Sequence, residues 1–229
     1  MEVVSGDMPT VLLIRHGESQ SNAGLPTSDP KFVELTAKGF KQANEIARIL
    51  KAQPSPDLIV TSSYLRTKQT GAPTRLVFPF VPEEEWPVHE FTYLAPSYWK
   101  EDTTVEERHP LVDAYWEICN PSYVDGLGSE SFEQFIKRVR EVKLRLKSIG
   151  LEKMVVFSHE QFISALLWLS KRDPGDLSPE TMKDFLAFLK ANPIPNGALR
   201  RLRIRKRQES QQSERASHVT EQEPALVGR

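Results

Sequence analysis

Residues 11–18 read Val-Leu-Leu-Ile-Arg-His-Gly-Glu, a run of four apolar residues followed at once by polar ones. A short apolar run rich in leucine and β-branched residues predicts a buried β-strand. The strand ends at Arg15 and His16, so a cation and an imidazole lie together on the loop that follows. Gly17 lets that loop turn sharply or approach a ligand closely. The segment therefore predicts a strand with two functional side chains at its carboxyl end.

Two later segments show the same pattern. Residues 57–63 form an apolar run that ends in small hydroxyl side chains, and Arg66 follows within one helical turn. Residues 153–159 form a third run, which ends in His159. Ligands of open α/β sheets bind outside the carboxyl ends of the strands. If the three strands are parallel neighbours, Arg66 and His159 share one pocket with the arginine and histidine of the first segment.

These three segments resemble, in the same order, the motifs of the histidine phosphatase (phosphoglycerate mutase-like) superfamily, in its branch with an Arg-His-Gly motif. The resemblance covers about residues 10–205. It implies a three-layer α/β/α sandwich with a mostly parallel central sheet and an inserted cap. It also implies metal-independent chemistry in which His16 takes a phosphoryl group onto a ring nitrogen. Arg15 and Arg66 would bind phosphate through planar, charged guanidinium groups, and His159 would donate to a phosphate oxygen.

Glu90 and Asn22 complete the site that the resemblance implies. The family supplies a Glu or Asp as general acid from the segment between the second strand and the long helix, and Glu90 best matches that region. The nearby Glu83, Glu84 and Glu85 are alternatives for the same role. Burial raises the pKa of a carboxyl group, so that it holds a proton near neutral pH. Asn22 matches a family position near the phosphate and would add a neutral donor.

Two residues depart from the family pattern. Glu160 stands where the family commonly has Gly after its second histidine, and Ser21 stands where many mutase-type members have Trp. A carboxylate at a helix N-terminus is favourable by about 0.3–1 kcal/mol, which would give Glu160 a structural role. If Glu160 points into the pocket instead, it repels phosphate and favours a substrate with a cationic or hydroxyl-rich group. The sequence leaves both alternatives open.

The composition narrows the classes of partner and compartment. The chain has 229 residues and a formal net charge of −1, so it has no global attraction to nucleic acid or anionic membranes. No apolar stretch approaches the length that spans a bilayer. The single cysteine, Cys119, excludes an intrachain disulfide and suits a reducing compartment. We expect a cytoplasmic protein with a small phosphorylated substrate, no nucleic-acid or membrane partner, no cofactor and no metal; the oligomeric state is left open.

The chain divides into a predicted α/β domain, residues 1–205, and a polar tail, residues 206–229, whose composition indicates disorder. Residues 79–128 contain several prolines and three of the four tryptophans but no regular pattern. We therefore expect an irregular cap with a short helix near residues 112–118. Helical spacing and capping residues predict helices at about 36–50, 64–76, 131–150, 161–170 and 178–191, and alternation predicts an edge strand at 198–205.

The reaction that we expect is hydrolysis of a phosphate monoester through a phosphohistidine on His16, which water then attacks. One alternative is a phosphoglycerate mutase-type phosphotransferase, which returns the phosphoryl group to the substrate and needs a site that excludes water. Another is a catalytically weak phosphate-binding protein that uses the same pocket without turnover.

Overall fold

The structure is a computed structural model that describes residues 9–99 and 102–204. The predicted disordered tail, residues 206–229, lies outside the described residues. The elements are, in chain order, β1 (Thr10–Arg15), α1 (Ala37–Lys51), β2 (Leu58–Thr61), α2 (Leu65–Val77), β3 (Glu83–Glu85), the 3₁₀ helix η1 (Pro96–Trp99), α3 (Val105–Ile118), α4 (Phe132–Ser148), β4 (Lys153–Ser158), α5 (Glu160–Lys171), α6 (Pro179–Ala191) and β5 (Leu199–Arg203).

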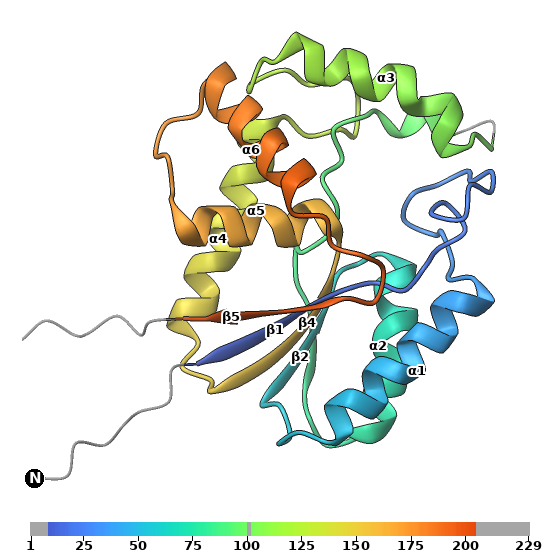
Figure 1. Ribbon diagram of the computed structural model, residues 1–229, viewed down its shortest axis with the longest axis vertical. Coiled ribbons are helices and arrows are strands. Elements are labelled where there is room, and N and C mark those ends of the chain that lie inside the picture. Colours follow the sequence, from blue (N-terminus) through green and yellow to red (C-terminus); the bar gives the residue numbers. More distant parts are fainter. Residues whose placement is uncertain (1–8, 100–101, 205–229) are drawn as a thin grey trace, which may run out of the picture.

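The named strands form one sheet in the order β3-β2-β4-β1-β5 (Figure 1). The first four strands in this order are parallel, and β5 runs antiparallel to β1 at the edge. Arg15 at the end of β1 lies opposite Ser158 at the end of β4. The carboxyl ends of these two strands therefore meet at the same edge of the sheet. The mostly parallel sheet and the predicted edge strand are both confirmed.

Helices cover both faces of the sheet. In Figure 1, α1 and α2 lie on one side, whereas α4 and α5 lie on the other, with α6 beside α5. Leu12 and Ile14 of β1 pack with Leu50 of α1, whereas Val11 and Leu13 belong to the larger core formed with the helices of the opposite face. A parallel strand buried on both faces has a continuous apolar sequence, as residues 11–14 do. The predicted three-layer α/β/α sandwich is confirmed.

None of the helices in the described part of the chain is both long and apolar enough to cross a membrane.

The segment at residues 79–128 is more regular than the sequence pattern predicts. Its strand β3 pairs with β2 although all three of its residues are glutamates, so its place in the sheet depends on backbone pairing rather than on apolar side chains. The short helix predicted at residues 112–118 is wrong, because α3 has 14 residues. A capping box begins this helix: Thr104 Oγ1 accepts from the Glu107 N–H, and the Glu107 carboxylate accepts from the Thr104 N–H.

The loop after β1 packs tightly against the start of α1. A Cβ on Gly17 would lie 2.6 Å from the carbonyl oxygen of Gly39, and a Cβ on Gly39 would lie 2.1 Å from that of Glu18. Both positions therefore require glycine. The Gly17 N–H also donates to Thr70 Oγ1 of α2 at 3.0 Å. These contacts fix the backbone next to His16.

Candidate active site

A pocket of about 280 Å³ lies at the carboxyl ends of the central strands. Five of the predicted site residues line it: Arg15, His16, Asn22, Arg66 and Glu90. The sixth, His159, is fully buried and lies behind the pocket wall, in contact with the lining residues His16, Tyr64 and Arg66. In residues 9–99 and 102–204, no group of three or more His, Cys, Asp or Glu side chains is placed to hold a metal ion.

His16 follows β1 and is held in one tautomer. Its Nδ1 lies 2.7 Å from the carbonyl oxygen of Gly17, which can only accept, so Nδ1 carries the proton. Its Nε2 accepts a hydrogen bond from Arg66 Nε at 3.1 Å. Burial and the charge of Arg66 hold the pKa of His16 well below its usual value. The imidazole is therefore neutral and has its lone pair on Nε2, the form in which a ring nitrogen acts as a nucleophile.

Arg66 lies in the first turn of α2 and joins the two histidines. Besides its bond to His16, its Nη2 lies 3.0 Å from His159 Nδ1, and its Nη1 donates to the carbonyl oxygen of Pro30 at 2.6 Å. Its guanidinium also lies over the Tyr64 ring, 4.8 Å from the centroid. Burial lowers the pKa of Arg66 to about 10, so the group stays charged at neutral pH. The permanent charge lies where a phosphoryl group on His16 would be.

His159 ends β4 and precedes α5. Because a guanidinium only donates, His159 Nδ1 accepts from Arg66, and its Nε2 carries the proton and donates to Ser62 Oγ at 2.8 Å. Burial and the charge of Arg66 hold the pKa of His159 well below its usual value. In this arrangement, His159 orients Arg66. Its donation to a phosphate oxygen stays a prediction, which requires a proton on Nδ1.

Arg15 is paired with Glu160, which departs from the family pattern. Arg15 Nη1 lies 2.7 Å from a carboxylate oxygen of Glu160 and 2.5 Å from the carbonyl oxygen of Ile194. The other oxygen of Glu160 accepts from the Ile194 N–H at 3.1 Å. Arg15 Nε is buried and has no hydrogen-bond partner among the described residues. Glu160 thus holds Arg15 against the loop before β5, and Arg15 retains an unpaired donor beside the pocket.

Glu90 contacts the start of α5. Its Oε1 accepts from the Gln161 N–H at 3.0 Å and from the Phe91 N–H at 3.2 Å. Burial raises the pKa of Glu90, and the charges of Arg66 and Arg15 oppose this shift only in part. Glu90 therefore keeps its proton to a higher pH than an exposed carboxyl group does, and it lines the pocket.

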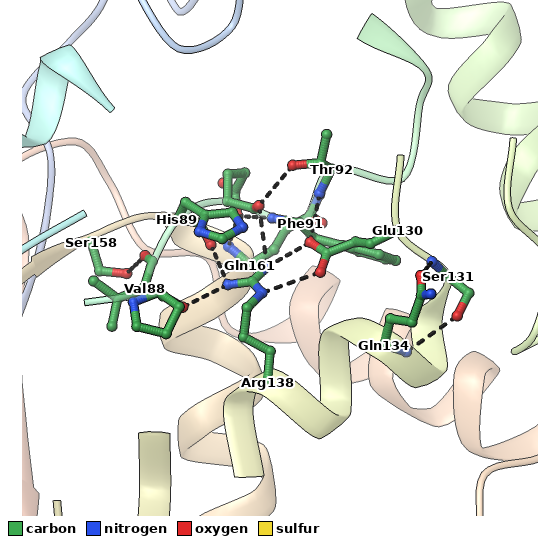
Figure 2. A network of polar contacts seen from close by, with 12 residues as sticks. Val88, His89, Phe91, Thr92, Glu130, Ser131, Gln134, Arg138, Ser158 and Gln161 are labelled. Atoms are coloured by element: carbon green, nitrogen blue, oxygen red, sulfur yellow. Dashed lines mark hydrogen bonds and ion pairs between the residues drawn. The ribbon is translucent and has the colours of Figure 1, made fainter. Parts of the chain in front are cut away.

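Arg138 of α4 holds the segment that carries Glu90, as Figure 2 shows. Its guanidinium donates to the carbonyl oxygens of Pro87, His89 and Glu90 at 2.9, 3.0 and 3.4 Å. Glu130 pairs with Arg138 at 2.5 Å and also accepts from the N–H of residue 92 at 3.0 Å. The backbone on both sides of the carboxyl group is therefore fixed by one partly buried ion pair. No local sequence pattern marks Arg138 for this role.

Asn22 lies at the mouth of the pocket and links two loops. Its Oδ1 accepts from Ser19 Oγ and from Asn196 Nδ2, both at 2.9 Å. Asn196 also donates to the carbonyl oxygen of His16 at 3.2 Å. Asn196 and Gly197 form a turn, and nothing in the sequence pattern marks Asn196 as part of the site. Such a turn brings this amide back onto the loop after β1.

Known proteins resemble this chain in sequence and structure. Residues 11–210 match the histidine phosphatase superfamily (branch 1). A metal-independent phosphoserine phosphatase of Arabidopsis thaliana is 26% identical over 168 residues, which are 71% of this chain and 69% of that protein.

Two solved structures share the fold. The α-ribazole phosphatase of Shigella flexneri has a TM-score of 0.65 at 22% identity, over 86% of this chain and 91% of that one. A mycobacterial glucosyl-3-phosphoglycerate phosphatase has a TM-score of 0.62 at 17% identity, over 84% and 89% of the two chains. Because the family match spans nearly all of the described residues, the chain belongs to the histidine phosphatase superfamily, branch 1.

Proposed function

We propose that the protein hydrolyses small phosphate monoesters without a metal ion, through a phosphohistidine on Nε2 of His16. The observation that carries this proposal is the fixed tautomer of His16, whose unprotonated Nε2 faces Arg66. Family membership and the relatives named as phosphatases support the same class of reaction. The single cysteine of the chain favours a reducing compartment, so we place this activity in the cytoplasm.

In the first step, Nε2 of His16 attacks phosphorus, and the bond between phosphorus and the ester oxygen breaks. Glu90 gives its proton to the leaving oxygen, and the product leaves as an alcohol. Arg66 and Arg15 stabilise the charge on the phosphoryl oxygens through their guanidinium groups. Burial of these groups strengthens that interaction, because water screens it less.

In the second step, the Glu90 carboxylate takes a proton from water as the water oxygen attacks the phosphohistidine. The bond between phosphorus and Nε2 breaks, so His16 and protonated Glu90 are regenerated and inorganic phosphate is released. The same carboxyl group thus acts first as acid and then as base. No step needs an external acid or a metal.

The test is release of phosphate from a panel of phosphomonoesters in the presence of a chelator. We expect turnover by the unsubstituted protein, none by His16→Ala, and a labelled phosphohistidine trapped by quenching at alkaline pH, where the bond between phosphorus and nitrogen is stable. His109→Ala is the matched control, because His109 is an exposed histidine of α3 that does not line the pocket. Unchanged turnover by His16→Ala would exclude the proposed nucleophile. Transfer of phosphate to a second substrate molecule, stimulated by a bisphosphate, would instead support a mutase.

A further inference from the structure

A third arginine, Arg108, lines the pocket beside the residues of the proposed phosphate site. Arg108 of α3 is 5% exposed and lines the same pocket as Arg15 and Arg66. The wall around it is apolar and aromatic. Its members from this part of the chain are Phe91, Tyr93, Leu94, Trp99, Val105 and Val112. A buried guanidinium in such a wall is unfavourable unless an anion or several hydrogen-bond acceptors contact it.

The contacts of Arg108 with the described residues use only one of its three nitrogen atoms. Nη1 donates to the carbonyl oxygen and to Oγ1 of Thr103, at 2.5 and 2.8 Å. The guanidinium carbon lies 4.5 Å from the centroid of the Trp99 ring, which fixes the plane of the group. No residue that the structure describes accepts a hydrogen bond from Nε or Nη2, and neither atom is sealed from solvent.

No carboxylate in the described ranges forms an ion pair with Arg108. The carboxylate of the adjacent Glu107 is exposed and accepts instead from the N–H and Oγ1 of Thr104, in the capping box of α3. The charge that acts most on Arg108 is that of the exposed Glu107 carboxylate, followed by Tyr93, and burial still lowers the pKa of Arg108 below its usual value. The Tyr93 hydroxyl is neutral because burial raises its pKa to about 12.

We propose that Arg108 binds a carboxylate on the organic part of the substrate, so that the substrates are small phosphate monoesters that also carry a carboxylate. This proposal rests on the proposed phosphatase function and names its substrate class. A planar guanidinium with two free donor atoms fits the two oxygens of a carboxylate. The single charge of Arg108 matches one negative charge, whereas the phosphate site has two arginines. The volume of about 280 Å³ lies at the small end of ligand pockets, which favours a short organic part.

Pairs of esters that differ only at the carboxylate test this proposal. One pair is O-phosphoserine and O-phosphoethanolamine, and another is 3-phosphoglycerate and glycerol 3-phosphate. We expect kcat/KM of the full chain to be about ten- to a hundredfold higher for the carboxylated member of each pair. Arg108→Met should abolish this ratio, and Arg108→Lys should retain part of it. A loosened fold would lower both members of a pair equally and would leave their ratio unchanged.

The matched control is Arg145→Met. Arg145 also stacks on a tryptophan, 3.9 Å from the centroid of the Trp86 ring, but it pairs with Glu84 and does not line the pocket. Its substitution should leave the ratio as it is. An equal kcat/KM for both members of each pair, or a ratio that survives in Arg108→Met, would overturn the proposal. If the protein preferred a bisphosphate of equal length to the carboxylated ester, the proposal would be wrong, and Arg108 would bind a second phosphate instead of a carboxylate.

The same pairs separate this proposal from the proposed reaction. If no ester is turned over, binding of each pair to His16→Ala is measured by calorimetry. Tighter binding of the carboxylated member, lost when Arg108→Met is added, would support the carboxylate subsite although the proposed hydrolysis had failed. Equal binding of both members would refute the subsite by itself.

Discussion

Replacing Arg138 with methionine tests whether this guanidinium positions the Glu90 carboxyl group. Methionine donates no hydrogen bond, so the three carbonyl oxygens of residues 87–90 lose their common partner. Glu130 also loses its ion-pair partner where the two side chains are only 11% and 16% exposed. Removal of one member of a buried pair destabilises a protein by about 3–5 kcal/mol. We expect the free energy of unfolding in urea to fall by about that amount.

The effect on activity should depend on the leaving group. An alkyl phosphate needs a proton on its leaving oxygen, so displacement of the Glu90 carboxyl group should lower kcat/KM by about ten- to a hundredfold. An aryl phosphate with an acidic phenol leaves without that proton, and its kcat/KM should fall by less than about threefold. Steady-state rates on both esters, at a temperature where the variant is folded, give this comparison.

Two further variants make the comparison decisive. Arg140→Met is the matched control, because Arg140 lies on the same helix but pairs with Asp173 near the surface, where the loss should be below about 1 kcal/mol. Glu130→Gln combined with Arg138→Met removes the orphaned charge and should recover part of the lost stability. Equal loss of activity on both esters would refute the positioning of Glu90 by Arg138.

Three other predictions concern charges in and near the pocket. Glu90→Gln should lower kcat/KM on an alkyl ester by about 10²–10⁴-fold. Because the pKa of Glu90 is raised, kcat/KM of the unsubstituted protein should fall as the pH rises through that pKa. If Glu90→Gln still showed this fall at high pH, Glu90 would not be the general acid. Glu160→Gln removes a negative charge next to Arg15, so inorganic phosphate should inhibit the protein about three- to tenfold more tightly. Weaker inhibition would show that the Glu160 carboxylate is needed to hold Arg15 in place for phosphate. Burial lowers the pKa of His89 from 6.5 to about 3, so below pH 6.5 the unfolded chain binds a proton that the folded chain does not. The free energy of unfolding should therefore fall as pH drops from 6.5 toward 3, and His89→Gln should flatten this slope in urea titrations.

The strand ends were predictable because the sheet is buried on both faces. Such strands have unbroken apolar runs, and a polar residue that ends a run marks the edge of the sheet. This pattern placed His16 and His159 at neighbouring strand ends, where the structure also has them. Strand β3 could not be predicted in this way, because it joins the sheet at its edge with three exposed or half-buried glutamates.

The contacts that position the site were not predictable from local pattern. Arg138 and Arg140 are both cationic residues of one helix, and only the fold brings the first to residues 87–92 and the second to Asp173. Helix α3 did carry a readable signal, since Thr104 and Glu107 have the spacing of a capping box. The irregular composition of residues 79–128 nevertheless favoured the prediction of only a short helix there.

The loop at residues 193–198 has a consequence for synthesis of the protein. It supplies the carbonyl oxygen that holds Arg15, and the N–H of Gly197 donates to the carbonyl oxygens of Arg15 and His16, both at 3.1 Å. These contacts join the end of β1 to the loop just before β5. A nascent chain on the ribosome therefore has His16 early but lacks the contacts that fix it until residues 193–198 have emerged. We therefore expect a chain that ends before residue 193 to lack the contacts that hold Arg15 and His16 in place.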